Sequence, residues 1–314
     1  MPSTGPRGIA LLVTMIAVAL MSLLVVDFTT TAALNYRASA NQANELRAAC
    51  LARSGVAIGL ALLAEGSLNQ PHGRVPYDTL SAPWAQPFRP LKIAGGEITV
   101  TVVDEARKLY LHELIDFETG QVNPSFAAVL ARLCGNIGVT PAIIPAIADW
   151  LDPDGITSPG GAEADYYLRL NPPYEPRNGP MPTIGDLRAV KGITDATFMR
   201  LARYLTVMPE PLVNANTAPP EVLSALSPVL ENNPQLVEEI VDARAKHPFT
   251  TVTDIGNLPG LGTLGNQVTQ MLTVRGHFFA INATGTFAGT RKRIVAIYRR
   301  IPNGRALLAA WYED

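Results

Sequence analysis

The strongest feature of the hydrophobic pattern is an uncharged apolar run near the N-terminus, from Ile9 to Val26, which ends at Asp27. In α-helical conformation a run of about 18 residues extends for about 27 Å, close to the thickness of the hydrocarbon core of a bilayer. The run is longer than the apolar core of a secretory signal peptide, and no small-x-small cleavage site follows it. The pattern therefore predicts a transmembrane helix over residues 9–26.

Beyond Asp27 the pattern becomes amphipathic, without a signal that would end the helix. From the apolar run to Ala64 the chain has no proline and only sparse glycine, which predicts one continuous helix of about 55 residues and about 80 Å. Polar residues such as Arg37 and Glu45 mark one side of residues 27–65. The apolar residues of the other side are Leu34, Ala38, Leu46, Ala49, Cys50, Val56, Leu60 and Leu63. We expect this part of the helix to pack on a soluble domain.

The hydrophobic period then changes to that of β-strands. After a Pro- and Gly-rich loop over Glu65–Pro90, residues alternate over Gly96–Asp104 as in a half-buried strand. Lys108–Ile115 is either a second short strand or a turn into a helix. Near the C-terminus, alternating segments on both sides of the turn at residues 288–290 predict a β-hairpin over residues 277–300.

A helical period interrupted by Pro and Gly fills the chain between these strands. The predicted fold class is therefore α+β, with the long N-terminal helix packed on an antiparallel sheet made from residues near 96–115 and 277–301. A large helical domain is inserted between those strands, as surface connections tolerate. The predicted divisions are 66–123 and 276–314 for the α/β core and 124–275 for the inserted domain.

Composition and charge narrow the range of functions. The net charge of −2 gives no electrostatic reason to expect a nucleic-acid partner. Two cysteines, Cys50 and Cys134, are too few for a disulfide scaffold, and we expect both to be buried as small apolar side chains. The four histidines are scattered, and no nucleophile or nucleotide-binding motif is visible. The sequence therefore predicts a protein without catalytic activity.

A short repeat lies inside the helical domain, at Thr183–Asp186 and Thr251–Asp254. Threonine followed three residues later by an acidic residue is similar to a capping box that starts a helix, and Gly192 and Gly260 are expected to end the two short helices. Leu258–Gly262 also resembles a helix-hairpin-helix, a motif that places backbone amides against DNA phosphates. Because few lysines and arginines flank either hairpin, packing or protein contact is the favoured hypothesis.

An acidic loop follows Trp150, with four carboxylates and no basic side chain among them. Such carboxylates repel one another unless a hard cation neutralises them, and flexible loop oxygens suit calcium better than magnesium. The spacing matches an EF-hand only in part, so the loop is not an EF-hand. A solvated acidic loop is the alternative, and Asp149 is either a helix cap or a further ligand. The predicted calcium ligands are Asp152, Asp154, Glu163 and Asp165.

The N-terminus resembles that of the type IV prepilin class, in which a short polar leader, here residues 1–8, ends in Arg-Gly directly before an apolar helix. The resemblance implies cleavage by a prepilin peptidase after Gly8 and N-methylation of Ile9. Major pilins of this class have a glutamate at mature position five, where this chain has Val13. Its absence is typical of the K-type minor pseudopilin at the filament tip, and a carboxylate in lipid is costly without a cationic partner.

Further blocks extend the resemblance to K-type minor pseudopilins of type II secretion over nearly the whole chain. In that family a pilin-like core is interrupted by a large helical domain, whose hairpins are described as SAM-like and structural, and related pseudopilins bind calcium. The blocks are Val103–Leu111, Ala148–Asp152, Ser158–Tyr167, Asp186–Gly192 and Val213–Ala218.

The resemblance predicts a non-catalytic subunit at the tip of a type II secretion pseudopilus. It implies a single-pass protein of the bacterial inner membrane with its C-terminal domain in the periplasm. The expected partners are the I- and J-type minor pseudopilins, contacted through the N-terminal helix and the head, and the prepilin peptidase, with no nucleic acid. The alternatives are a plain N-terminal signal anchor, a minor pilin of a type IV pilus, and a DNA-binding helix-hairpin-helix protein.

Overall fold

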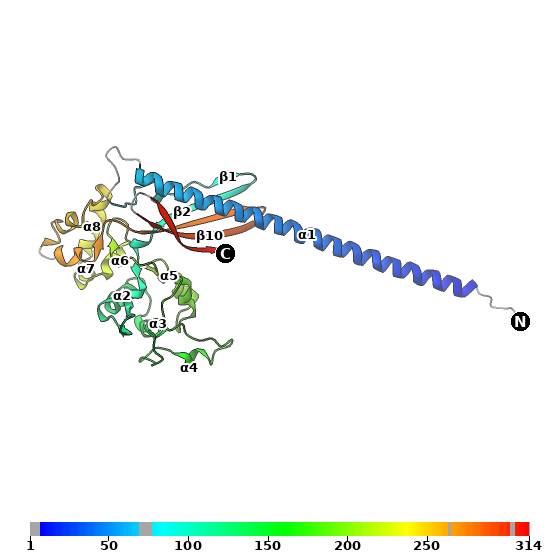
Figure 1. Ribbon diagram of the computed structural model, residues 1–314, viewed down its shortest axis with the longest axis horizontal. Helices are drawn as coiled ribbons and strands as arrows, with labels where there is room; N and C mark the ends of the chain where they lie inside the picture. The colour runs from blue at the N-terminus through cyan, green and yellow to red at the C-terminus, as the bar shows by residue number, and fades with distance from the viewer. Residues whose placement is uncertain (1–6, 69–76, 263–264, 302–304, 314) are drawn as a thin grey trace.

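The longest element of the molecule is a single helix that projects from a globular head (Figure 1). Helix α1, Arg7–Leu68, has 62 residues, which corresponds to about 93 Å. Its C-terminal part lies against the head, so the predicted continuous helix is confirmed. Residues 1–6 of the predicted leader lie outside the described residues. The computed structural model describes residues 7–68, 77–262, 265–301 and 305–313.

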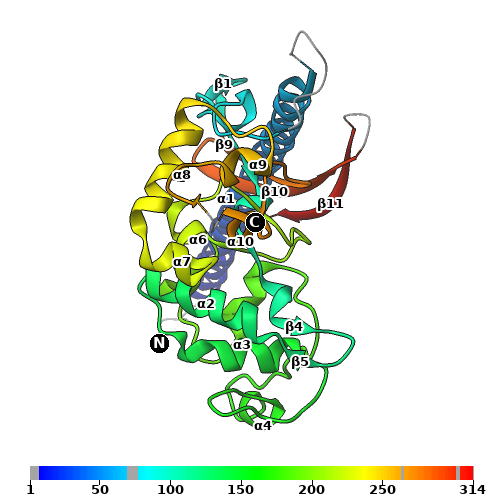
Figure 2. The same ribbon diagram turned by 90° about the vertical axis from the view of Figure 1, so that its left-hand side faces the viewer.

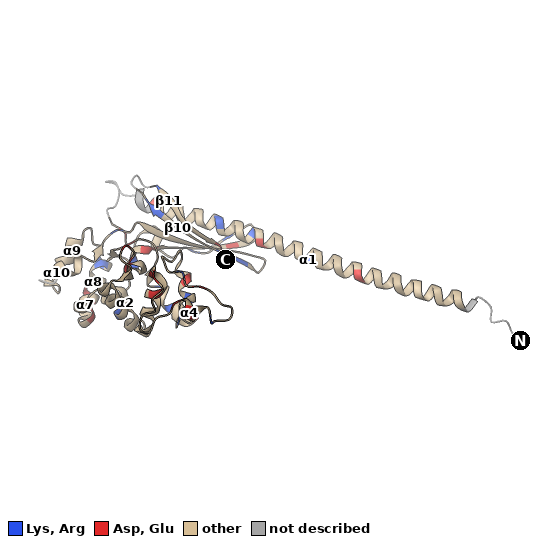
Figure 3. Ribbon diagram, turned by 60° about the horizontal axis from the view of Figure 1, so that its bottom comes forward, with Lys and Arg blue, Asp and Glu red and all other residues tan. Residues whose placement is uncertain are grey.

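The projecting part of α1 suits a lipid environment, because it is apolar and several of its threonine hydroxyls are satisfied within the helix. Asp27 is the only charged residue between Ile9 and Tyr36 (Figure 3). The hydroxyls of Thr14 and Thr30 each donate to a backbone carbonyl three or four residues earlier, at 2.8 Å. Among the described residues, this helix is the one long and apolar enough to cross a membrane.

The α/β core contains, in the described part of the chain, a five-stranded antiparallel sheet with the order β1-β2-β9-β10-β11. The predicted strand and hairpin are confirmed, whereas β1 and β11 were not predicted. Ala288 and Gly289 of the hairpin turn have φ values of 47° and 83°, as a type I′ turn requires. The strands are β1 Leu91–Ile93, β2 Gly96–Asp104, β9 Phe278–Phe287, β10 Thr290–Arg300 and β11 Ala306–Glu313.

The segment 108–115 is not part of this sheet, so the prediction that the sheet extends to residue 115 is wrong, although the predicted short strand is present there as β3. The chain leaves the sheet at Asp104, whose carboxylate accepts a hydrogen bond from the Ala106 amide at 3.0 Å and so caps a tight turn. Beyond the turn, β3 pairs in parallel with a strand of the inserted domain. The short elements concerned are η1 Pro83–Ala85, η2 Glu105–Arg107, β3 Leu109–Tyr110, η3 Leu111–Leu114, β4 Ile115–Asp116, β5 Gln121–Val122 and β6 Leu205–Thr206.

The C-terminal half of α1 packs on one face of the sheet through small residues. Ala48 and Ala52 are fully buried, and both glycines of this stretch, Gly55 and Gly59, are buried as well. A Cβ added at Gly59 would lie only 2.4 Å from Cγ2 of Ile281 in β9. The missing side chains therefore allow the helix backbone to approach the sheet closely.

The predicted apolar side of α1 is confirmed at Val56 and Leu63, which are buried, and is wrong nearer the membrane segment. The prediction that Cys50 is buried is also wrong, because its side chain is exposed. The physical reason is that the helix-sheet contact selects small residues, whereas the prediction gave most weight to large apolar ones. The predicted residues that are exposed are Leu34, Ala38, Leu46 and Cys50.

The inserted domain (green to orange in Figure 2) packs around its own hydrophobic core. Cys134 is buried in that core as predicted, and burial raises the pKa of its thiol to about 11. The elements are α2 Pro124–Asn136, η4 Pro141–Ile143, α3 Ile144–Leu151, α4 Ala164–Tyr167, η5 Ile184–Ala189, α5 Asp195–Leu201, β7 Val213–Asn214, α6 Pro220–Ala225, α7 Pro228–Asn232, α8 Pro234–Lys246, α9 Val252–Gly256, α10 Gly265–Thr269 and β8 Leu272–Thr273.

Both predicted capping boxes are present, at Thr183 before η5 and at Thr251 before α9. Gly192 follows η5 with a φ of 82°, the left-handed conformation expected of a glycine beyond a helix end. The second helix ends earlier than predicted, at Gly256 rather than near Gly260. The helical conformation is disfavoured there because a proline follows within the next turn.

Candidate functional site

The acidic loop brings three carboxylates together at the C-terminal end of α3. One oxygen from each of Asp149, Asp152 and Glu163 lies within 4.8 Å of the others, and all three residues are buried. Asp149 belongs to the last turn of α3, Asp152 follows that helix directly, and Glu163 precedes α4. We call these three residues the acidic cluster.

The acidic cluster leaves several buried oxygens without a partner. Within the part of the chain that the structure describes, Oδ1 of Asp149, Oδ1 of Asp152 and Oε1 of Glu163 accept no hydrogen bond. The same holds for Oδ1 of Asn178, whose amide nitrogen donates to the Asp154 carbonyl at 2.6 Å and to Glu163 Oε2 at 3.4 Å. Each unsatisfied buried polar group costs about 1–3 kcal/mol. A cation with oxygen ligands would remove that cost.

The pKa values of the acidic cluster also favour a bound cation. Burial, and then repulsion from neighbouring carboxylates, raises the pKa of Asp152 to about 7. Burial also raises the pKa of Glu163, although the hydrogen bond from Asn178 opposes that shift. Carboxyl groups in such positions resist ionisation unless a positive charge is close. The residues present therefore fit a hard divalent cation such as calcium.

The walls of the acidic cluster are closely packed. A Cβ added at Gly161 would lie 2.0 Å from Oδ2 of Asp149, so this loop backbone approaches the carboxylate directly. The same Asp149 oxygen accepts a hydrogen bond from the Ser158 amide at 3.1 Å. The ring of Trp150, the residue after Asp149, meets that of Tyr167 edge to face, with centroids 5.2 Å apart. The Asp149 carboxylate is therefore closely enclosed by the loop backbone.

Only part of the predicted ligand set lies in the acidic cluster. Asp152 and Glu163 do, whereas Asp154 and Asp165 are exposed and outside the group of three. Asp154 Oδ1 instead accepts from the Ile156 amide at 2.7 Å within a tight turn. Asn178 was missed, because its position in the sequence, far beyond the loop, gives no local signal.

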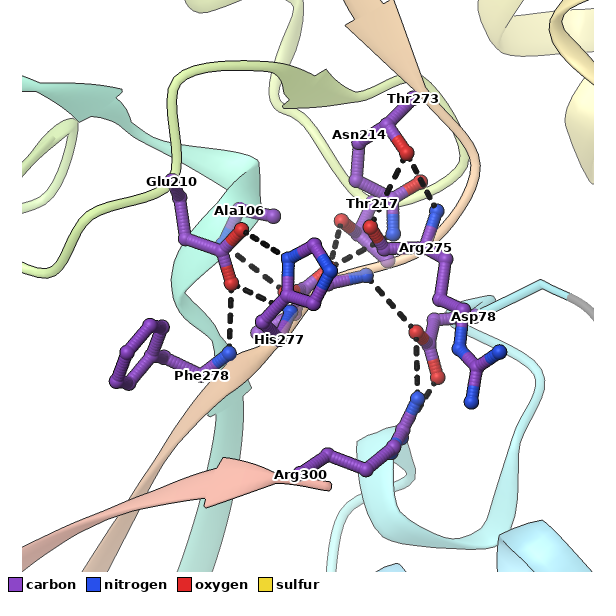
Figure 4. A network of polar contacts seen from close by, with 12 residues as sticks. Asp78, Ala106, Glu210, Asn214, Thr217, Thr273, Arg275, His277, Phe278 and Arg300 are labelled. Carbon is purple, nitrogen blue, oxygen red and sulfur yellow. Dashed lines mark hydrogen bonds and ion pairs between the residues drawn. The ribbon is translucent and has the colours of Figure 1, made fainter. Parts of the chain in front are cut away.

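A second polar site joins the inserted domain to the sheet (Figure 4). Asp104, at the end of β2, accepts from Asn214 Nδ2 at 2.8 Å and from Thr217 Oγ1 at 2.7 Å, both in the inserted domain. A Cβ added at Gly276 would lie 2.1 Å from Asp104 Oδ1. Burial, and then repulsion from Asp78, raises the pKa of Asp104 to about 7, although its hydrogen bonds oppose the shift.

Two further carboxylates complete this site, which we call the joint. Asp78 is bound by the Arg300 guanidinium at 2.8 and 2.9 Å, and it accepts from the Gly276 amide at 3.0 Å. Glu210 accepts from the amides of His277 and Phe278 at 2.5 and 2.6 Å. All three carboxylates are buried. Because Asp104 and Glu210 are paired across the domain boundary, while Asp78 binds Arg300 within the core, the joint fixes the inserted domain on the sheet.

These features define a class: a pilin-like subunit in which a helix of lipid-spanning length packs on an antiparallel sheet that carries an inserted helical domain. Two models described as "Type II secretion system (T2SS), protein K" match residues 108–210 and 213–275, which together make up more than half of the chain. The chain belongs to this family, that of protein K, a minor pseudopilin of the type II secretion system.

Similar proteins agree with that assignment. The chain is 29% identical over 318 residues to the type II secretion system protein K of Pseudomonas aeruginosa, covering 98% of this chain and 92% of that protein. It is also 29% identical over 266 residues to the protein K of Klebsiella pneumoniae, covering 81% and 80%. These matches confirm the resemblance predicted from the sequence.

A solved structure has the same fold. One chain of the crystal structure of the GspK-GspI-GspJ complex from the enterotoxigenic Escherichia coli type 2 secretion system matches with a TM-score of 0.68 and 19% sequence identity. The match covers 89% of this chain and 99% of that one. The mixed fold with a long N-terminal helix and an antiparallel sheet is thereby confirmed.

Proposed function

We propose that this chain is the tip subunit of a type II secretion pseudopilus, with a structural rather than a catalytic role. The observation that carries the proposal is the continuity of α1, which is apolar and exposed at one end and packed on a broad head at the other. A head wider than its shaft would obstruct the addition of another subunit above it. Val13 supports the tip position, since a subunit with no neighbour above gains from lacking a carboxylate in lipid.

The proposed partners are the I- and J-type minor pseudopilins. The similarity to a chain of the GspK-GspI-GspJ complex supports them. So does the surface of α1 beyond the membrane segment, where Phe28, Leu34, Tyr36 and Leu46 are each at least 60% exposed. Exposed large apolar side chains on a helix outside the membrane segment are typical of a surface that packs against other helices.

The same proposal places α1 across the inner membrane as a single span, with the head in the periplasm and the leader removed in the cytoplasm. We predict that protein purified from bacterial membranes that contain a prepilin peptidase begins at N-methylated Ile9, as measured by intact mass and N-terminal peptide mass spectrometry. Changing Gly8→Leu should leave the leader attached, whereas Gly5→Leu should not. A mature chain that begins at Met1 in the unaltered protein would exclude this processing.

We also propose that the acidic cluster binds calcium, with ligands from Asp149, Asp152, Glu163 and Asn178. The unpaired buried oxygens of these four residues support the proposal. Calcium accepts six to eight oxygen ligands in flexible geometry, so carbonyl groups or water would complete the shell. Bound calcium would fix the end of α3 against the start of α4.

The calcium proposal predicts a rise in thermal stability on calcium addition. At about 100 times its dissociation constant, calcium would stabilise the fold by about 2.7 kcal/mol. The double change Asp152→Asn with Glu163→Gln should abolish the response, while the matched double change Asp154→Asn with Asp165→Asn should retain it. The measurement is the melting temperature of the full chain in detergent, with calcium, magnesium or EGTA. A calcium response that survives the first pair of changes would contradict the proposed ligands.

The raised pKa values predict how the calcium-free protein responds to pH. Asp152 and Asp104 have a pKa of about 7 in the fold against an ordinary value of 3.8, so between these pH values the folded protein keeps protons that the unfolded chain has released. The stabilisation that comes from keeping these protons is complete below about pH 4 and is lost as the pH rises through about 7. Carboxylates whose pKa is lowered in the fold, such as Asp254, change the free energy of unfolding only at pH values lower than this range.

The measurement is the free energy of unfolding in urea, with EGTA, across this pH range. We expect it to fall as the pH rises, and Asp152→Asn should make the fall smaller. An equal fall in the unaltered protein and in the Asp152→Asn variant would contradict the raised pKa of Asp152.

The second hairpin gives no support to the alternative of DNA binding. The amide of Gly260, which a phosphate would need, donates to Oε1 of Glu239 at 3.2 Å. A carboxylate at that position would repel a phosphate oxygen. The hairpin therefore satisfies its own amide by packing against α8.

A further inference from the structure

A groove of about 540 Å³ runs between the inserted domain and the face of the sheet opposite α1. Val103, Val295 and Ile297 form its apolar floor. These residues alternate along their strands with Val102, Ile294 and Ala296, which are buried in the sheet, so they point to the opposite face. The other wall comes from η5 and α5 of the inserted domain. Because the joint fixes the two domains relative to each other (Figure 4), the groove has a defined width.

The groove is basic, although the chain as a whole has a net charge of −2. The sole carboxylate among the described residues that line it, Glu105, is 3% exposed and already accepts from the Lys108 ammonium at 2.7 Å and the Thr206 hydroxyl at 2.6 Å. Because Glu105 already pairs with Lys108, the arginines of the lining have no carboxylate partner among the described lining residues. The basic residues of the lining are Lys108, Arg188, Arg203 and Arg293.

Two of the arginines are held in place from opposite walls. Arg188 stacks on the ring of Phe198, with its guanidinium carbon 3.6 Å from the ring centroid. Its ion pair with Asp195, at 3.3 Å, is largely in solvent, because the Asp195 side chain is 90% exposed. Across the groove, Arg293 donates to Oδ1 of Asn282 at 2.9 Å. Each guanidinium retains further N–H groups, which can bind a carboxylate in bidentate geometry.

The groove continues along the sheet into an adjoining hollow, which shares Asn282 and Arg293 with it and reaches Arg291. Thr99 and Thr284 line this extension and offer hydroxyl groups. An open path with an apolar floor at one end, hydroxyl groups at the other and arginines between them suits an extended chain rather than a compact small molecule.

We propose that this groove binds an extended, acidic peptide segment of another protein. Its carboxylates would pair with Arg188 and Arg293, and an aliphatic side chain would lie on Val295 beside Met199, which is 54% exposed. The choice of a peptide rests on charge complementarity together with the order of the groove-facing positions along β10, where Arg291 and Arg293 precede Val295 and Ile297, because a partner in extended conformation can match that two-residue spacing. The segment would contact both domains at once.

The test is fluorescence anisotropy with the full chain in detergent micelles and a labelled peptide of about eight residues. Every second residue of the peptide is Glu, Glu, Val and Val in turn, with Ser between them, so that an extended strand presents both kinds of side chain on one face. A counterpart with Lys in place of Glu and a labelled single-stranded oligonucleotide serve as competing probes. We expect the Glu peptide to bind about tenfold or more tightly than the Lys peptide, and added salt to weaken that binding.

Paired charge reversals locate the binding. Arg188→Glu with Arg293→Glu should weaken binding of the Glu peptide by about tenfold or more, because two charge-assisted contacts are lost. Arg89→Glu with Arg169→Glu, two exposed positions outside the groove, changes the net charge equally and should leave binding unchanged.

Equal binding of the Glu and Lys peptides, or an equal loss in both double variants, would overturn the proposal. Tighter binding of the oligonucleotide, lost on the groove changes, would assign the groove to nucleic acid instead. Neither result bears on the membrane insertion of α1 or on calcium binding, which are tested separately.

Discussion

The approach of α1 to the sheet depends on glycine on both sides of the contact. A Cβ at Gly59 would lie 2.4 Å from Cγ2 of Ile281, and one at Gly285 in β9 would lie 2.1 Å from the carbonyl oxygen of Ala48. The helix backbone therefore lies almost on the strand backbone, where larger residues would hold it off. This contact sets the direction in which the apolar half of α1 leaves the head. It therefore fixes the orientation of that half relative to the sheet and to the inserted domain.

The inserted domain is attached by a different kind of interaction. The buried carboxylates of Asp104 and Glu210 each accept several hydrogen bonds across the domain boundary. Such hydrogen bonds are directional, and displacing one partner leaves a buried polar group unpaired, which costs free energy. They therefore specify one orientation of the inserted domain on the sheet. The basic groove depends on that orientation, whereas the acidic cluster depends on the core of the inserted domain. Close packing therefore fixes α1 on the sheet, and polar contacts fix the inserted domain on it.

Features with a local signal could be predicted from the sequence, and features created by distant residues could not. The unbroken helix, the strand at Gly96–Asp104, the hairpin and both capping boxes follow from periodicity and turn chemistry within a few residues. The buried side of α1 was predicted at Val56 and Leu63 and missed at Ala48 and Ala52, because small residues give little hydrophobic signal. Asn178 joins Asp152 and Glu163 only through the fold, and the unpaired buried oxygens become visible only with coordinates.

The most direct test of the membrane-spanning shaft uses nitroxide labels at Leu20→Cys and Ser54→Cys, each in a Cys50→Ser background, with the full chain in lipid nanodiscs. Electron paramagnetic resonance measures how strongly molecular oxygen, which concentrates in lipid, and a water-soluble nickel chelate relax each label. If α1 threads the bilayer and continues into the head, the label at position 20 responds to oxygen and the one at position 54 to the chelate. Strong relaxation of both labels by the chelate would mean that the apolar half of α1 lies in water.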